Sequence, residues 1–473
     1  MSNFKFHFDY IVIGSGPGGM VTGCLLAEQQ KNVLILEKGH NILQNYQDPF
    51  NLLSLQKNYA YSGLNTTIGK RPVKLIEGEC VGGGSEVNSG LYHRTPPHIL
   101  LDWSKHKEIA GLCESETNAF FEENEKELSI QPFTPPFPTA SQRLIDISQQ
   151  NNWTVNEVLR WVEQSPIQSS LSFKRFSISQ CYLDRFKKAG GQLNSGHSVT
   201  SIKKIGATWH IISTENLNQH TFTCKTLFIC AGSLGTPFLL LKNQLLNQRR
   251  LPLYLHPMIK FITKFHEPII ETKPLVAMHQ ITEFLPKFNV GSSISSLPFL
   301  GLGLYHYPEA LKSIYTLSPF LSSYYISVPT HIPASIITIP GLSFPIVRYS
   351  ISKSDRFLFF QAINQIANAF LQNNTEAIYV DGRNLPILNS KTPHLESEKQ
   401  LDFAEFSSVH LMGSCPMHSD PNNGFTNSFG KVYGHDNLYI NDASLFCSSI
   451  GVNPQGTVMM LAKRNLYHFL NEL

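Results

Sequence analysis

Two residues near the C-terminus have side chains suited to acting on a hydroxyl group. His410 stands beside a glycine loop in "SSVHLMGSCPMHSD", residues 407–420. Near neutral pH an imidazole is the side chain best matched to taking a hydroxyl proton, although a lone histidine is more often structural. Asn453, in "GVNPQG", carries an amide that can donate a hydrogen bond to a substrate oxygen without competing for its proton.

The sequence around Asn453 predicts the start of a helix. Residues 438–440 form a short apolar strand that ends at Asn441 and Asp442. Asn453 suits the N-cap and Pro454 the first helical position, where the missing N–H would have had no partner. Taken alone, this pattern indicates an ordinary terminal helix docked on the protein.

The N-terminal segment "FDYIVIGSGPGGMVTGCLLAEQQKNVLILEKG", residues 8–39, predicts strand, glycine turn, helix and strand. The turn has the spacing G-x-G-x-x-G, formed by Gly14, Gly16 and Gly19. These glycines allow a tight turn, close approach of a pyrophosphate to the helix N-terminus, and helix–strand packing. Glu37 ends the second strand, where a carboxylate can accept from ribose hydroxyls. The segment predicts a dinucleotide site and leaves open whether NAD or FAD occupies it.

Two further segments contain glycines at turns. Residues 78–96, "GECVGGGSEVNSGLYHRTP", offer a backbone that can lie flat against a ligand, although a surface turn explains them equally well. The ligand-facing residues there are Gly83, Gly84, Ser85 and Asn88. Residues 226–243, "TLFICAGSLGTPFLLLKN", predict a buried strand that breaks at Ala231-Gly232 and a helix that starts at Thr236-Pro237.

Together these segments resemble the glucose–methanol–choline (GMC) family of FAD-dependent alcohol oxidoreductases. The resemblance rests on "VGGGSEVNSG", "AGSLGTP", "HLMGSC", and "NLYINDAS" followed by "GVNPQGTVMMLAKR". The glycine triplet and "GVNP" are most similar to cholesterol oxidases, and "HLMGSC" to long-chain alcohol oxidases. The resemblance implies FAD as the cofactor, and an α/β fold in which a Rossmann-like FAD-binding domain joins a discontinuous substrate domain built on an antiparallel sheet.

The family's organisation implies domains assembled from distant pieces of chain. The FAD-binding domain is expected to comprise residues 1–95, 190–250 and 405–473. The substrate domain would comprise residues 96–189 and 251–404, whose short apolar runs and frequent prolines fit an antiparallel sheet with apolar faces.

The resemblance also assigns roles to single residues. His410 matches the general base, and Asn453 matches the position that hydrogen-bonds the substrate oxygen, although an Asn453 that caps its own helix cannot do both. The helix after Asn453 would point its N-terminus at the pyrimidine edge of the flavin, and Asp442 would hold the ribityl chain. Further cofactor-binding positions are Val199, Ala231, Gly232, Ala443 and Pro454.

The sequence departs from the family pattern at three places. Val87 stands where members with a covalent flavin can carry His, so the FAD is expected to be non-covalent. The second catalytic position is Asn453 where other members have His. Pro416-Met417-His418 follow "HLMGSC" where relatives often have Arg-Met-Gly, so the geometry of that loop does not follow from the family.

Composition and charge exclude several other classes of protein. The 473 residues include 38 basic and 35 acidic ones, a formal net charge of +3, which gives no support for a nucleic-acid or polybasic membrane surface. The eight cysteines include no C-x-x-C pair, which indicates reduced thiols and neither a disulfide frame nor a zinc site, and no metal is expected. No signal peptide or transmembrane segment is evident, so a cytoplasmic location is expected. The oligomeric state is left open.

The expected reaction is hydride transfer from an alcohol CH–OH group to FAD. Abundant Phe, Leu, Ile and Tyr in the middle of the chain favour an apolar, long-chain or sterol-like alcohol. Oxygen or a carrier would then accept the electrons. The alternatives are an FAD-retaining lyase similar to hydroxynitrile lyases, a sugar or polyol dehydrogenase, and a flavin-loaded module without turnover, which His410 and Asn453 disfavour.

Overall fold

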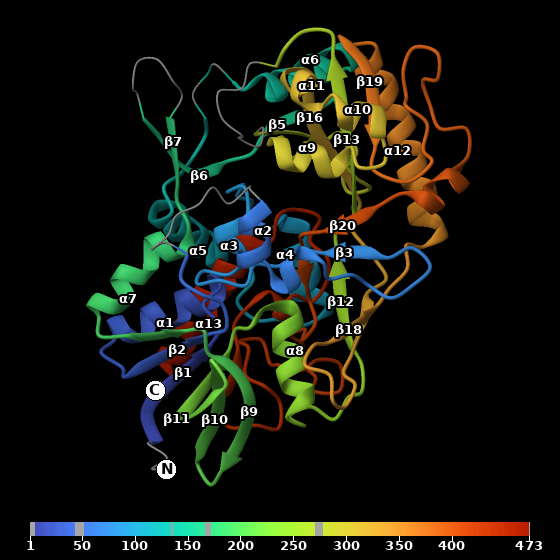
Figure 1. The fold of residues 1–473 in the computed structure, drawn as a ribbon. Helices are drawn as coiled ribbons and strands as arrows, with labels where there is room; N and C mark the ends of the chain where they lie inside the picture. The colour runs from blue at the N-terminus through green and yellow to red at the C-terminus, as the bar shows by residue number, and fades with distance from the viewer. Residues whose placement is uncertain are drawn as a thin grey trace.

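The computed structural model describes residues 5–42, 52–133, 135, 137–165, 172–269 and 278–472. Two main sheets organise this part of the chain. Figure 1 shows the first sheet, with β1, β2 and β9–β11, in the lower half of the molecule, and the larger sheet, with β13, β16 and β19, in the upper half. The mixed α/β architecture agrees with the prediction.

The first sheet has the strand order β8-β2-β1-β11-β10-β9, and β22 also pairs with β11. Its strands are β1 (Lys5–Ile13), β2 (Val33–Glu37), β8 (Gln192–Ser195), β9 (Ser198–Ile205), β10 (Thr208–Glu215), β11 (Asn218–Ile229) and β22 (Leu438–Ile440). β8, β2, β1, β11 and β22 run parallel, whereas β10 and β9 are antiparallel. Three distant segments of the chain therefore build one sheet.

The central parallel strands are buried on both faces. β2 is buried along its whole length, which explains its continuous apolar sequence. α1 (Pro17–Glu28) packs against α13 (Gln455–Asn471), the C-terminal helix. The four strands predicted around residues 10–13, 33–36, 226–230 and 438–440 are present, and β1 and β11 are longer than expected.

Two predicted helix starts were wrong. α8 (Gly232–Lys242) begins at Gly232, before Thr236-Pro237, because the carboxylate of Asp442 accepts a hydrogen bond from the Gly232 N–H and satisfies a free donor of the first turn. α13 begins at Gln455 with Pro454 as its N-cap, one residue later than predicted. Pro454 has no side-chain donor or acceptor, so this start has no side-chain cap.

The second sheet has the order β3-β20-β13-β16-β15-β14-β5, with β19 also paired to β13. Its strands are β3 (Val73–Leu75), β5 (Val155–Glu157), β13 (Met258–Phe265), β14 (His279–Ile281), β15 (Asn289–Ser292), β16 (Leu321–Ser327), β19 (Thr375–Val380) and β20 (Phe406–Ser408). All pairs are antiparallel except β20–β3. β3 and β20 belong to this sheet, although they come from segments predicted for the FAD-binding domain. The domain boundaries stay a prediction.

Smaller elements surround the two sheets. A four-stranded sheet comprises β12 (Leu251–Leu255), β17 (Ala334–Ile337), β18 (Ile346–Arg348) and β21 (Leu411–Met412), and a three-stranded one β4 (Ile130–Gln131), β6 (Arg160–Ser165) and β7 (Ser172–Arg175). The remaining helices are α2 (Leu52–Asn58), α3 (Gly84–Val87), α4 (Pro97–His106), α5 (Glu114–Glu127), α6 (Thr139–Asn151), α7 (Asp184–Lys188), α9 (Leu297–Gly303), α10 (Pro308–Lys312), α11 (Ile314–Leu317) and α12 (Lys353–Leu371).

The cysteines and the long helices can be compared with what the composition predicted. All eight cysteines are free thiols and six of them are buried, as the sequence indicated. Within the described ranges, no helix is both long and apolar enough to cross a bilayer.

Candidate active site

The carboxyl ends of four parallel strands meet at one edge of the first sheet. The residues aligned across β2, β1, β11 and β22 are Leu36, Ile13, Ile229 and Ile440. The next residues along these strands, Glu37, Gly14, Cys230 and Asn441, therefore lie side by side. Ligands of doubly wound sheets bind at this edge. A cavity of about 1040 Å³ opens there and extends under the second sheet.

This cavity gathers nearly all of the residues predicted for the site. Those that line it are Gly14, Gly16, Glu37, Gly83, Gly84, Ser85, Asn88, Val199, Ala231, Gly232, His410, Asp442, Ala443, Asn453 and Pro454. Gly19 is the exception. A Cβ there would lie 2.0 Å from the carbonyl oxygen of Gly14, so this glycine packs α1 on β1. The role of each residue toward the cofactor stays a prediction.

The glycine turn has the shape that a dinucleotide requires. Gly14 has φ +98°, and a Cβ there would lie 2.3 Å from the Cys230 carbonyl oxygen. By contrast, a Cβ at Gly16 or Gly84 would meet no protein atom within 4 Å, so both backbones face open space in the cavity. No side chain caps the start of α1, whose N–H groups remain available for an anion. The residues present therefore fit a pyrophosphate.

Glu37 is held rigidly at the end of β2. Its carboxylate accepts hydrogen bonds from the backbone N–H of Ser15 (2.8 Å), the Ser15 hydroxyl (2.7 Å) and the Gly39 N–H (2.8 Å). The side chain is buried, and burial raises its pKa. The carboxylate still lines the cavity, where it can accept from a ribose hydroxyl as predicted.

Asp442 connects three elements at the same edge. One carboxylate oxygen accepts from the Gly232 N–H (2.8 Å) and the Thr236 hydroxyl (2.6 Å) at the start of α8. The other accepts from the backbone N–H (2.8 Å) and hydroxyl of Ser444. Burial raises the pKa of Asp442. These bonds fix the junction of β11, β22 and α8, which is a structural function that the sequence did not indicate.

The start of α13 is fixed by contacts other than a cap. The Asn88 amide donates to the Gln455 side chain (2.8 Å), which joins the glycine loop to the helix. A Cβ at Gly456 would lie 2.2 Å from the His93 carbonyl oxygen, so only glycine allows this approach. Pro454 is the N-cap, and among the described residues the Asn453 amide has no hydrogen-bonding partner. The amide is therefore free to bind a substrate.

A second histidine, His256, lies directly opposite His410 and was missed by the sequence analysis. β12 pairs with β21 so that Leu255 is opposite Leu411, and the next pair in this register is His256 with His410. Their Nδ1 atoms lie 3.0 Å apart. Nε2 of His256 accepts from the Gly451 N–H (3.2 Å) and lies 2.8 Å from the Ser449 hydroxyl. The only sequence signal was a histidine that ends a strand pattern, in "LPLYLHP".

These contacts couple the tautomers of the two rings. While the Gly451 N–H donates to Nε2 of neutral His256, the proton of that ring is on Nδ1 and points at His410. If the ring proton of His256 moves to Nε2 and faces Ser449, Nδ1 of His256 becomes an acceptor. His410 then carries its own proton on Nδ1, and its Nε2 has a free lone pair. This second arrangement is the one in which His410 can act as a base.

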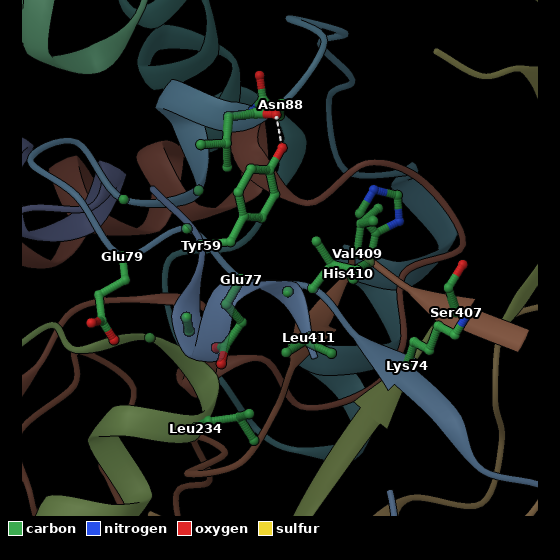
Figure 2. Close-up of a pocket in the computed structure, with 18 of the residues that line it drawn as sticks. Tyr59, Lys74, Glu77, Glu79, Asn88, Leu234, Ser407, Val409, His410 and Leu411 are labelled. Carbon is green, nitrogen blue, oxygen red and sulfur yellow. Dashed lines mark hydrogen bonds between the residues drawn. The ribbon is translucent and has the colours of Figure 1, made fainter. Parts of the chain in front are cut away.

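The surroundings of both rings favour their neutral form. Burial lowers the pKa of His256 to about 3. Burial first, and then the neighbouring His256 and His93, hold the pKa of His410 well below its usual value. His410 lines the cavity between Val409 and Leu411, on the opposite side from Tyr59 (Figure 2). A neutral imidazole in this position can accept a proton.

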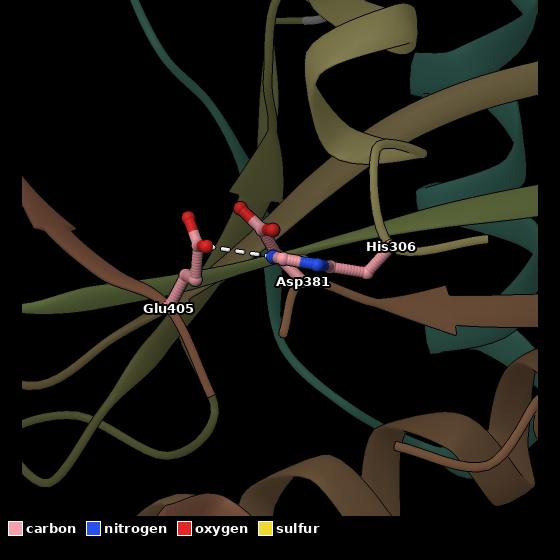
Figure 3. Close-up of side chains that lie close together, drawn as sticks. All are labelled: His306, Asp381 and Glu405. Atoms are coloured by element: carbon pink, nitrogen blue, oxygen red, sulfur yellow. Dashed lines mark hydrogen bonds and ion pairs between the residues drawn. The ribbon is translucent and has the colours of Figure 1, made fainter. Parts of the chain in front are cut away.

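The face of the second sheet that covers the cavity is mixed, because polar residues lie beside Met258 and Ile262, whereas apolar faces were expected. Its cavity-lining polar residues are Lys74, Lys260, Ser323, Tyr325, Glu405 and Ser407. A ring nitrogen of His306 and one carboxylate oxygen each of Asp381 and Glu405 lie within 4.8 Å of one another, as a metal site would require (Figure 3). Lys74 forms an ion pair with Glu405, and its positive charge opposes binding of a metal ion.

The family follows from comparison with known proteins. Two family models, both described as GMC oxidoreductase, match residues 8–258 and 341–462. The chain belongs to the GMC oxidoreductase family. Members of this family are FAD-dependent, so FAD is the cofactor. That the glycine loops and Glu37 hold it stays a prediction. The predicted family and cofactor are thus confirmed.

Individual relatives are distant. The GMC-type oxidoreductase y4nJ of Sinorhizobium fredii is 23% identical over 98% of this chain and 94% of its own length. The long-chain-alcohol oxidase FAO3 of Arabidopsis thaliana is also 23% identical, over 96% of this chain and 66% of its own length. Among solved structures, pyridoxine 4-oxidase from Mesorbium loti has a TM-score of 0.76 at 15% identity, covering 98% of this chain and 99% of its own. This structural likeness shows the fold.

Proposed function

We propose that this protein oxidises alcohols at their CH–OH group, with His410 as the general base and Asn453 as the residue that orients the substrate oxygen. The observation that carries the proposal is a cavity lined at once by the glycine loops, by a neutral His410 and by an unpaired Asn453 amide. FAD, when bound, supplies the hydride acceptor for this chemistry.

Each residue has a distinct task in this reaction. The Asn453 amide donates to the alcohol oxygen and leaves its proton available to His410. His410 accepts that proton at Nε2 when its own ring proton is on Nδ1 and donates to Nδ1 of His256. The uncapped N–H groups at the start of α13 stabilise negative charge beside Asn453. The apolar side chains of the cavity wall limit the water around the reacting carbon.

The substrate class we propose is a long-chain or similarly apolar alcohol. Apolar residues of the cavity wall include Leu91, Ile262, Ile294, Phe299 and Leu302. Each methylene buried against them contributes up to about 0.8 kcal/mol to binding. The similarity to a long-chain-alcohol oxidase supports the same class. The electrons would pass from FAD to oxygen or to a carrier.

Anaerobic flavin bleaching tests this proposal. The holoprotein is mixed without oxygen with primary alcohols of increasing length, a sterol, glucose and choline. We expect bleaching, with an efficiency that rises along the alcohol series. Glucose that reduces the flavin faster than a ten-carbon alcohol would favour the polyol dehydrogenase instead. An FAD that no alcohol bleaches would favour a lyase or a module without turnover.

A further inference from the structure

Two strands share one edge of β13, and they meet at Lys260. β20 pairs with Met258 and Ile259 on this edge, and β19 pairs with the residues from Phe261 onward. Between them, the Asp381 N–H donates to the Lys260 carbonyl (2.9 Å), and the Glu405 N–H donates to the Asp381 carbonyl (2.9 Å). The fold therefore brings three charged side chains from three segments to one point on the cavity wall.

His306, which follows α9, and Lys74 of β3 complete this group. We call the five residues the Lys260 recess: Lys74, Lys260, His306, Asp381 and Glu405, all of which line the cavity. Figure 3 shows that His306, Asp381 and Glu405 converge from different elements. Glu405 is fully engaged, since one oxygen pairs with Lys74 and the other lies 2.7 Å from Nε2 of His306.

Lys260 and Asp381 are the two groups of the recess that remain unsatisfied. Among the described residues, neither side chain has a hydrogen-bonding partner, and the Lys260 ammonium lies 6.0 Å from the centroid of the Phe299 ring. Burial lowers the pKa of Lys260, and burial raises the pKa of Asp381 to about 6. Both side chains are half-buried at the cavity wall, so a ligand that bonds to the ammonium and the carboxylate would replace the water there and satisfy both groups.

The charge of the Lys260 recess determines which kind of ligand group binds there. Two lysines and two carboxylates balance one another, so an added ion would leave a net charge in a partly buried place. A hydroxyl keeps the balance. It accepts a hydrogen bond from the Lys260 ammonium and donates one to the Asp381 carboxylate.

The length of chain between the two positions limits their separation. His256, opposite His410, lies in the link between β12 and β13, and Lys260 of β13 follows it by four residues. Four residues span at most about 14 Å between their Cα atoms. With carbon–carbon bonds of about 1.5 Å in a staggered chain, on the order of ten carbons span this distance.

We propose that the Lys260 recess binds a second, neutral hydroxyl of the substrate, at a position whose backbone lies at most about 14 Å from that of His256, the neighbour of His410. This inference rests on the proposed function and narrows it. The preferred substrates are long alcohols with a hydroxyl at the far end, such as alkanediols.

Binding can be measured independently of turnover. The His410→Ala holoprotein is titrated calorimetrically with 1-decanol, 1,10-decanediol and 10-hydroxydecanoate. We expect the diol to bind at least about tenfold more tightly than the mono-alcohol, which corresponds to the low end of one hydrogen bond to a charged group. Lys260→Met should bring this ratio close to one. Lys264→Met is the matched control on the same strand, because Lys264 pairs with Glu376 (2.6 Å) and does not line the cavity.

Three results would overturn the inference. One is equal affinity for the diol and the mono-alcohol, and another is tighter binding of the hydroxy acid, which would make the recess an anion site. The third is stoichiometric binding of Mn²⁺ alone that Glu405→Gln abolishes, which would make it a metal site. Anaerobic bleaching of the wild-type flavin by 1-decanol tests the proposed function separately. In the proposed reaction, bleaching depends on His410 and Asn453 and not on the Lys260 recess, so it should still occur when the recess binds no hydroxyl.

Discussion

Replacing His256 with Asn tests whether this residue controls the base. The structure gives His256 one hydrogen bond to His410, between Nδ1 atoms 3.0 Å apart. A neutral hydrogen bond contributes about 1 kcal/mol, so its loss should slow flavin reduction about fivefold. This is far less than the loss of the base itself, because His256 does not touch the substrate.

The pH dependence of His256→Asn gives a sharper readout. His256 is one of the groups that hold the pKa of His410 below its usual value, together with burial and His93. Its removal should raise the pKa of His410, so that the variant loses activity at a higher pH than the wild type as the solution is acidified. Stopped-flow measurement of anaerobic flavin reduction between pH 5 and 9 follows this acidic limb.

Only a shift of the acidic limb to higher pH agrees with coupling of the two histidines. An unchanged limb would refute the coupling of the two histidines. Loss of bound FAD with no shift of the limb would show that His256 is only structural. His435→Asn is the control, because that side chain bonds the Leu245 carbonyl (2.7 Å) and does not line the cavity.

Further predictions concern the base, the cofactor and acid stability. His410→Ala should keep bound FAD by absorbance and lose two to four orders of magnitude, roughly, in the flavin reduction rate, the usual contribution of a general base. Gly16→Val should give colourless protein of normal circular dichroism, because the new side chain meets no protein atom and occupies cofactor space. Acid precipitation should release FAD into the supernatant, since Val87 offers no attachment point; flavin in the pellet would contradict this. Burial lowers the pKa of His93 to about 4 and that of His256 to about 3, whereas a histidine of the unfolded chain has a pKa of about 6.5. Between these values and pH 6.5, the unfolded state therefore binds more protons than the folded state. The free energy of unfolding in urea should therefore fall as the pH drops below about 6.5, by up to about 1.4 kcal/mol per pH unit for each histidine, and more gently in His93→Asn.

Local sequence was sufficient to predict the cofactor edge. Gly14 and Gly16 lie between a strand and a helix, and their spacing follows from contacts within a few residues of one another. The strand that ends at Glu37 and the one that ends at Asp442 are equally local patterns. Apolar periodicity and turn-forming residues depend only on neighbouring positions in the chain, which is why these elements could be identified from the sequence.

Helix starts depended on partners far away in the chain. α8 begins at Gly232 because the Asp442 carboxylate, 210 residues later, satisfies its first free donor. A sequence pattern reports which residues can cap a helix, and it does not report which carboxylate arrives from another segment.

Only the tertiary structure decided what surrounds the reacting groups. His256 meets His410 because β12 and β21, from segments 154 residues apart, pair in one particular register. Lys260 and Asp381 come together because β19 and β20 share an edge of β13. A shift of one residue in either pairing would turn these side chains to the opposite face, and register is set by packing of the whole sheet. The sequence by itself thus predicted the cofactor and the proposed base, whereas the long-range strand register determined which histidine lies beside His410 and which polar residues line the cavity.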